Sequence, residues 1–314
     1  MNRLLHILTH KRPAGSITEQ QLLADLFSNY ETTTREGNTI ISVGDSTTLF
    51  SCHTDTVHSS PGIQRVFYDA EFTAISLEID QPESSCLGAD DGAGMWLLLE
   101  MIDAGVPGTY IFHHSEEQGG IGSAALSKDT EYLRQFNRAI AFDRKGTEDI
   151  IEAQRGGECC SKEFVSALSA QFAEQNLPYR GARGVFTDTA NYIHIIPECT
   201  NLSVGYYSEH TTGEWLDVEH LMQLREACIQ LDWESLPTAR NPHEQPPSNL
   251  FDMYAPSTLR SDLAYWGSRC RITTEKDAAA LSLEDLIDEC EVFPIEAAEL
   301  VWGFLHPAEQ EITE

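Results

Sequence analysis

Two helical patterns of apolar and polar positions open the chain. Residues 16–19 (Ser-Ile-Thr-Glu) form a capping box, in which each polar side chain can bond a free backbone N–H, and Leu22, Leu23 and Leu26 follow at helical spacing. The same period continues further along the chain. It predicts helices over residues 91–104, 162–174, 189–194 and 218–232.

Short apolar runs alternate with these helices. They predict strands over residues 39–43, 47–52, 74–79, 109–113, 139–142 and 201–205. The first two runs flank Gly44-Asp45-Ser46, which predicts a hairpin turn. Strands that alternate with helices indicate an α/β layered fold with a largely parallel or mixed sheet.

The pattern changes near Pro237. Residues 237–256 contain five of the 13 prolines and few apolar residues, which predicts a linker. Residues 281–305 are acidic and apolar at helical spacing, which predicts one or two helices. We therefore expect a catalytic domain over residues 1–236, followed by a Pro-rich linker and an acidic helical extension over residues 237–314.

Charge narrows the classes of partner. The 314 residues include 50 acidic and 20 basic side chains, a formal net charge of -30. Such a surface repels nucleic acid phosphates and anionic membranes, so neither is expected as a partner. The mean hydropathy of -0.29 and the lack of a long uncharged apolar run argue against a transmembrane span. Basic and polar residues break up the first 15 positions, so we expect no secretory signal and a cytoplasmic protein.

The eight cysteines do not point to a metal or redox motif. None forms a Cys-x-x-Cys pair. Without a secretory signal, free thiols are expected rather than a disulfide framework. The adjacent Cys159 and Cys160 are interpreted in the same way.

Five short polar motifs lie beside predicted strand ends or loops, and four of them follow an apolar strand directly. Active sites of open α/β sheets form outside the carboxyl ends of the strands, so one site could collect all five. The motifs are Ser-Cys-His53-Thr-Asp55-Thr, Gly-Ala-Asp90-Asp91-Gly-Ala-Gly94, His-Ser-Glu116-Glu117-Gln-Gly-Gly, Phe-Asp143-Arg-Lys-Gly and Tyr-Ser-Glu-His210-Thr.

The residue types in these motifs predict a catalytic metal site. Imidazole and carboxylate ligands without thiolate are typical of catalytic rather than structural zinc. Two histidines and three carboxylates can hold two ions if one carboxylate bridges them, which is a recognised hydrolytic arrangement. The His53-x-Asp55 spacing lets a carboxylate accept the second ring N–H of the imidazole. Glu116 and Glu117 point in different directions on an extended segment, so one can bind metal while the other faces the attacking water.

The ordered set resembles the co-catalytic dizinc exopeptidases (clan MH), the superfamily of bacterial leucine aminopeptidases, peptidase T and glutamate carboxypeptidases, over roughly residues 1–235. The resemblance implies a three-layer α/β/α sandwich with a mixed, largely parallel central sheet. It also implies two Zn²⁺ ions, with Co²⁺ or Mn²⁺ as substitutes. The residues that it assigns are the metal ligands His53, Asp90, Glu117, Asp143 and His210, the general base Glu116, and Asp55, which orients His53.

Asp90 bridges the two ions in this scheme. The remaining ligands pair as His53 with Asp143 and Glu117 with His210. In the resembling families the bridging Asp lies four residues before a Gly, as Asp90 lies before Gly94. Asp91 is then expected to start a helix rather than to bind metal.

Two features depart from parts of the superfamily. Peptidase T and the glutamate carboxypeptidases insert a lid or dimerisation domain between the last two ligand motifs, and the segment from Asp143 to His210 is too short for it. The layout is therefore expected to be closest to the compact leucine aminopeptidases. The tail after Pro237 has no counterpart in the resemblance.

The resemblance implies a zinc-dependent metallo-exopeptidase, a hydrolase of peptide or amide bonds, and within that class an aminopeptidase for small peptides. An N-acyl amino acid deacylase or a carboxypeptidase would use the same dizinc site and stays open. A glutaminyl cyclase works with one zinc and lacks the His53-type ligand, so His53 argues against it. The intact ligand set argues against a non-catalytic binding module. The substrate side chain, the native metal and the oligomeric state stay open.

Overall fold

The computed structural model describes residues 1–154 and 157–243. The described residues all belong to one compact unit, which begins at Met1. The backbone N–H groups of Ala239 and Arg240 donate to the Glu198 carboxylate, at 2.7 and 3.0 Å, so this part of the predicted linker packs on the rest of the unit. The division at residue 236 stays a prediction, and the predicted helices of residues 281–305 lie outside the described residues.

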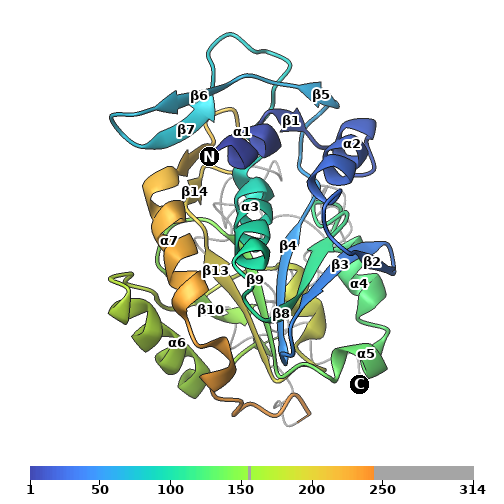
Figure 1. The fold of residues 1–314 in the computed structure, drawn as a ribbon, viewed down its shortest axis with the longest axis vertical. Coiled ribbons are helices and arrows are strands. Elements are labelled where there is room, and N and C mark those ends of the chain that lie inside the picture. The colour runs from blue at the N-terminus through green and yellow to red at the C-terminus, as the bar shows by residue number, and fades with distance from the viewer. Residues whose placement is uncertain (155–156, 244–314) are drawn as a thin grey trace, which may run out of the picture. The chain divides into compact units, whose positions relative to one another are not determined.

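A nine-stranded mixed sheet forms the centre of the unit (Figure 1). Its order is β11-β10-β13-β9-β4-β8-β3-β2, with β12 also paired to β10. Strands β13, β9, β4 and β8 run parallel, which confirms the predicted fold class. The strands are β2 (Thr33–Arg35), β3 (Asn38–Val43), β4 (Thr48–His53), β8 (Gly108–His113), β9 (Arg138–Arg144), β10 (Asp149–Gln154), β11 (Gly157–Glu158), β12 (Arg180–Arg183) and β13 (Glu198–Ser203).

The predicted hairpin around residues 44–46 is wrong. Strands β3 and β4 do not pair with each other, because β8 lies between them. β8 pairs antiparallel with β3 and parallel with β4. The turn reverses the chain as predicted, but the apolar β8 takes the central position, where both of its edges are hydrogen-bonded and its side chains are buried.

Helices flank this sheet. Of residues 189–194, predicted as a helix, only 189–192 are helical, within a short 3-10 helix, η1. The helices are α1 (Asn2–Leu8), α2 (Ile17–Leu26), α3 (Ala89–Asp103), α4 (Ile121–Leu126), α5 (Thr130–Leu133), α6 (Lys162–Glu174), α7 (Val218–Gln230), η1 (Asp188–Tyr192) and η2 (Trp233–Ser235). At the start of α2, Ser16 accepts the Glu19 N–H and Glu19 accepts the Gly15 N–H, so both polar ends of the predicted capping box are used.

Helix α3 positions the centre of the site. It packs on the face of the sheet over β4 and β9 and contacts α1 and α7 (Figure 1). Because it is covered on all these sides, nearly its whole length is buried, including Trp96. Such a helix is apolar around its full circumference, which is why its sequence lacks a polar face.

Two small sheets lie outside the central one. The four-stranded sheet has the order β14-β15-β7-β6, and the other joins β1 to β5. The loop between β14 and β15 carries His210, so pairing of β15 with β7 anchors that loop. The strands are β14 (Tyr206–Tyr207), β15 (Trp215–Asp217), β7 (Ala74–Leu77), β6 (Val66–Asp69), β1 (His10–Lys11) and β5 (Gly62–Ile63).

The six cysteines in the described residues are free thiols, as predicted, and the structure shows that all six are buried. Cys270 and Cys290 lie outside the described residues. Among the helices that the structure describes, none is long and apolar enough to cross a membrane.

Candidate functional site

The five motifs meet at the carboxyl ends of the central strands, where active sites of open α/β sheets form. His53 is the last residue of β4, and Asp143 lies near the end of β9. Glu116 and Glu117 follow the end of β8, and His210 follows β14. The structure therefore brings together every residue that the sequence assigned to the site.

The carboxylate of Asp90 lies between two groups of side chains whose nitrogen and oxygen atoms are close enough together to hold a metal ion. Its Oδ1 is 2.9 Å from His53 Nε2, and its Oδ2 is 3.2 Å from His210 Nε2. Asp143 Oδ1 lies 3.5 Å from the His53 nitrogen, and Glu117 Oε1 lies 2.8 Å from the His210 nitrogen. The ligand atoms of each group lie within 4.8 Å of one another. This donor set of imidazole and carboxylate groups fits two catalytic zinc ions.

The start of α3 fixes Asp90 through its neighbour Asp91. The Asp91 carboxylate accepts the backbone N–H of Gly94 at 3.0 Å and that of His53 at 3.2 Å. Asp91 thus acts at the helix start, as the sequence indicated. A Cβ atom at Gly94 would lie 2.2 Å from the Phe142 carbonyl oxygen and 2.5 Å from Asp91 Oδ1. Only glycine fits there, which gives the Asp90-to-Gly94 spacing its physical reason.

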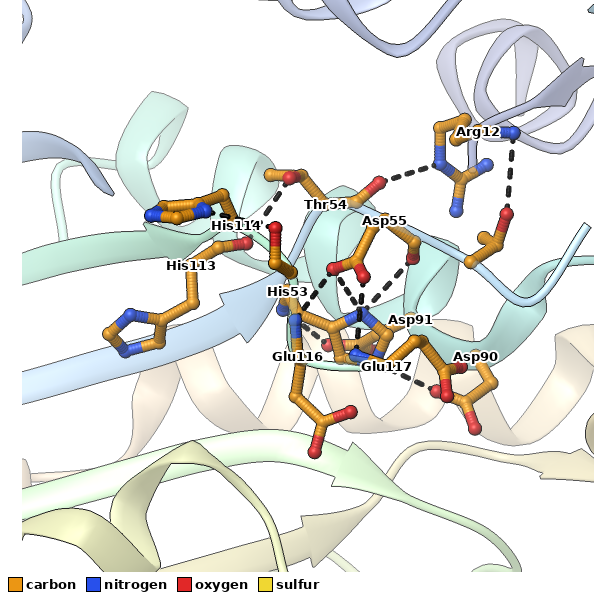
Figure 2. A network of polar contacts seen from close by, with 12 residues as sticks. Arg12, His53, Thr54, Asp55, Asp90, Asp91, His113, His114, Glu116 and Glu117 are labelled. Atoms are coloured by element: carbon orange, nitrogen blue, oxygen red, sulfur yellow. Dashed lines mark hydrogen bonds and ion pairs between the residues drawn. The ribbon is translucent and has the colours of Figure 1, made fainter. Parts of the chain in front are cut away.

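Asp55 links two of the motifs (Figure 2). Its carboxylate accepts the backbone N–H groups of Glu116 and Glu117, at 2.9 and 3.2 Å. His53 Nδ1 lies 3.1 Å from the Asp55 carbonyl oxygen and 3.6 Å from its carboxylate. Asp55 is fully buried, so these contacts are shielded from water. It holds the imidazole and the segment of the two glutamates in one arrangement.

The two adjacent glutamates point in different directions, as expected for an extended segment (Figure 2). The side chain of Glu117 reaches toward Asp90 and contacts His210, whereas that of Glu116 points away from Asp90. Burial raises the pKa of Glu116 well above that of an exposed glutamate, and the negative charges of Asp143 and Asp188 add to this shift. Of the two adjacent glutamates, Glu116 is therefore the one that lies outside both ligand groups.

Electrostatics mark the site as one for cations. Burial alone would raise the pKa of Asp90, but hydrogen bonds with His210 and His53 outweigh it and lower the pKa below its ordinary value. Burial would lower the pKa of His210, but its hydrogen bonds to Asp90 and Glu117 raise it to about 11. In the absence of metal, protons on the imidazoles balance the carboxylates, and divalent ions would supply the same positive charge.

Several contacts that support the site were not found from the sequence. Thr187 Oγ1 donates to Asp143 Oδ2 at 2.7 Å, and the Tyr206 hydroxyl donates to Asp143 Oδ1 at 3.1 Å. The Asn201 side chain accepts the backbone N–H of Asp143 at 2.9 Å and donates to the backbone carbonyl oxygen of Asp143 at 2.6 Å. Glu214 accepts backbone N–H groups at the start of α3. Single polar residues at these positions carry no local motif, so only their contacts reveal them.

His113 lies next to the site in sequence but outside both ligand groups. Its ring nitrogens contact Asn38 at 3.0 Å and Tyr192 at 3.3 Å. Burial lowers its pKa to about 3, so the ring is neutral. It is a packed histidine with both ring nitrogens in polar contacts.

Comparisons with solved structures identify the fold. The chain is similar to aminopeptidase PepT from Bacillus cereus, with 16% identity, 73% of this chain and 95% of that chain covered, and a TM-score of 0.59. A tripeptidase from Staphylococcus aureus gives 15% identity, the same coverages and a TM-score of 0.59. The TET1 peptidase of Pyrococcus horikoshii can assemble into a tetrahedron or a large octahedral shell. It gives 14% identity, with 74% of this chain and 99% of that chain covered and a TM-score of 0.54.

No protein-family model matches the chain, and no curated protein matches it. At these identities the likeness shows the fold, which is the one that the resemblance to co-catalytic zinc exopeptidases implied. Each described element between Asp143 and His210 joins one of the sheets or packs beside the central one, so no lid domain interrupts this segment in the part of the chain that the structure describes. The closer likeness to compact leucine aminopeptidases stays a prediction.

Proposed function

We propose that the protein is a zinc-dependent aminopeptidase that hydrolyses small peptides. The observation that carries this proposal is Asp90, whose two carboxylate oxygens face two separate imidazole nitrogens, His53 Nε2 and His210 Nε2. A bridging carboxylate between two such groups is the arrangement that two-metal hydrolases need. The peptidase fold supports the proposal, since the matching solved structures are an aminopeptidase, a tripeptidase and a TET peptidase.

The chain's own residues have distinct roles in this mechanism. His53, Asp143, Glu117 and His210 would hold the two ions, with Asp90 between them. When bound, the ions supply Lewis acidity, which makes water more acidic and the scissile carbonyl more electrophilic. Glu116 takes a proton from the attacking water and delivers it to the leaving amine. The raised pKa of Glu116 suits a base that must also give its proton back.

The charges beside the ligand set favour an amino-terminal substrate over an acidic one. Glu116 and the buried Asp188 lie beside the ligand set; burial raises the pKa of Glu116 and raises that of Asp188 to about 8, and neither group in any protonation state offers a positive charge to a substrate carboxylate. Lys145 is paired with Glu209 at 2.7 Å, and Arg144 with Asp149 at 3.1 Å. A carboxypeptidase or an N-acyl amino acid deacylase must bind a substrate carboxylate, which this acidic surrounding disfavours. A free α-amino group carries the complementary charge.

A panel of substrates tests the proposal. The metal-stripped full chain is reloaded with zinc, cobalt or manganese and assayed on aminoacyl, peptidyl and N-acyl substrates. We expect metal-dependent release of amino-terminal residues and two bound ions per chain. Release only from N-acyl substrates would replace the aminopeptidase with the deacylase, and a plateau at one ion would refute the two-metal site.

Two substitutions separate the roles of the adjacent glutamates. Glu116→Gln keeps the shape but cannot accept a proton, so turnover should fall by roughly 10²–10⁴-fold, with both ions retained. Glu117→Gln replaces an anionic ligand with a neutral amide, so metal affinity should fall and excess zinc should restore part of the activity. If Glu116→Gln loses an ion while Glu117→Gln keeps both, the two assignments are reversed. Full activity of both variants would exclude this site.

A further inference from the structure

A buried carboxylate outside the ligand set binds the backbone that carries Asp90. Glu214 is only 1% exposed. Its Oε2 accepts the N–H groups of Leu87 and Gly88, at 2.9 and 3.0 Å. Its Oε1 accepts those of Ala89 and Asp90, at 2.7 and 3.0 Å. One side chain thus binds four consecutive backbone donors, which together form an anion-binding concavity.

This contact joins two parts of the candidate metal site that are far apart in the sequence. Glu214 lies four residues after His210, in the loop between β14 and β15. The last of its four donors is the N–H of Asp90 itself. Glu214 therefore sets the position of the Asp90 backbone relative to the His210 loop, and Asp90 Oδ2 lies 3.2 Å from His210 Nε2.

A second contact binds a backbone carbonyl group of the same segment, residues 87–90. The buried guanidinium of Arg12 donates to the Gly88 carbonyl oxygen at 3.0 Å. With the N–H groups of residues 87–90 bound to Glu214, the turn has little freedom to move. The turn is thus fixed before any ion binds, and a preorganised ligand raises metal affinity.

We propose that Glu214 is a positioning residue of the metal centre, which sets the affinity for the two ions by holding Asp90 against His210. This inference rests on the proposed function, because it takes the residues around Asp90 as the metal ligands. A carboxylate is required at this position, since its two oxygens accept two N–H groups each. An amide would point its NH₂ group at two of the four donors and leave them unpaired.

The structure offers a matched control, Glu198. This carboxylate is also buried and accepts four hydrogen bonds, from the N–H and hydroxyl of Ser161 and the N–H groups of Ala239 and Arg240, at 2.7 to 3.0 Å. Glu198 is the first residue of β13, at the end of the sheet opposite to the site. Glu198→Gln therefore removes an equivalent buried carboxylate without touching the turn at Asp90.

The experiment is calorimetric titration of the metal-stripped full chain with Zn²⁺, on wild type, Glu214→Gln and Glu198→Gln. We expect a 10–100-fold loss of zinc affinity in Glu214→Gln, the usual effect of losing a group that orients a ligand. We expect the zinc affinity of Glu198→Gln to stay within twofold of that of the wild type. Both variants should unfold at lower urea concentrations than the wild type. The visible absorption of the Co²⁺-loaded protein should change in Glu214→Gln alone, because it reports ligand geometry.

Wild-type zinc affinity in folded Glu214→Gln overturns the proposal, and so does an equal loss in Glu198→Gln. Should Glu214→Gln not fold, Glu214→Asp decides. It keeps the charge but shortens the reach by one methylene, and the same loss of affinity is expected, with wild-type affinity overturning the proposal. Peptide hydrolysis is measured on the same samples. A wild type that binds two ions without hydrolysing peptides refutes the proposed function, while the affinity ratio still decides the role of Glu214. A wild type that binds no ion refutes both.

Discussion

Acid should destabilise the metal-free protein through one buried histidine, His58. Its Nδ1 lies 2.6 Å from the Thr56 hydroxyl, and its Nε2 lies 3.0 Å from both Gln64 Oε1 and the Cys86 carbonyl oxygen. The neutral ring satisfies all of these partners. Burial lowers the pKa of His58, with the charge of Arg12 acting in the same direction, to about 4.

The size of the effect follows from linkage. The folded-state pKa of about 4 lies below the ordinary value of 6.5, so the unfolded chain binds more protons between these two values. The contribution of His58 to stability is complete above pH 6.5 and is lost as the pH falls toward 4. At pH 5 the loss is about 2 kcal/mol, a large part of the 5–15 kcal/mol that is typical of a domain.

His58→Gln isolates this contribution. The glutamine amide can accept from Thr56 and donate toward Gln64, but it does not ionise. Urea unfolding of the metal-stripped protein at pH 7.5 and pH 5 gives the free energy of unfolding for each variant. We expect the variant to be less stable than wild type at pH 7.5, because the smaller side chain packs less well, and to recover about 2 kcal/mol relative to wild type at pH 5.

An equivalent substitution on the surface serves as the control. His194 is exposed, so His194→Gln should leave the difference between the two pH values unchanged. The pH should stay at 5 or above, because the sequence pI of 4.5 favours precipitation below it. A constant stability difference between wild type and His58→Gln at both pH values would show that the buried ring is not held neutral, and the reasoning would fail.

Two further substitutions test the framework of the site. Asp55→Asn leaves one backbone N–H of residues 116–117 without an acceptor. The free energy of unfolding, measured with urea, should therefore fall by about 1–3 kcal/mol, and the zinc affinity, measured by calorimetry, should fall by roughly tenfold or more. An unchanged zinc affinity would contradict the positioning role of Asp55. Gly94→Ala forces a Cβ against the Phe142 carbonyl oxygen and should cost about 1–3 kcal/mol of stability or more, whereas Gly213→Ala, with no contact closer than 3.6 Å, should change it little.

The fold class could be predicted from the amino-acid sequence alone, and so could the types of side chain that meet at the candidate site. Apolar runs that alternate with helical patterns predict an α/β sheet, and the parallel strands β13, β9, β4 and β8 confirm it. The polar motifs could be placed at one site because those of His53, Glu116 and Asp143 follow parallel strands whose carboxyl ends meet at one edge; the motif of His210, predicted to follow the strand at residues 201–205 directly, instead follows the short strand β14. Imidazole and carboxylate side chains then indicate catalytic zinc by ligand type alone. These inferences depend only on residue type and on neighbours within a few positions.

Features that depend on contacts between distant residues could not be predicted from the sequence. β8 inserts between β3 and β4, although a local turn predicted that those two strands would pair. Glu214 binds the turn of Asp90 across more than a hundred positions, and Tyr206 reaches Asp143 from another strand. Such contacts have no sequence period or motif, because the energy of a buried hydrogen bond depends on where the folded chain places donor and acceptor, and not on their separation along it.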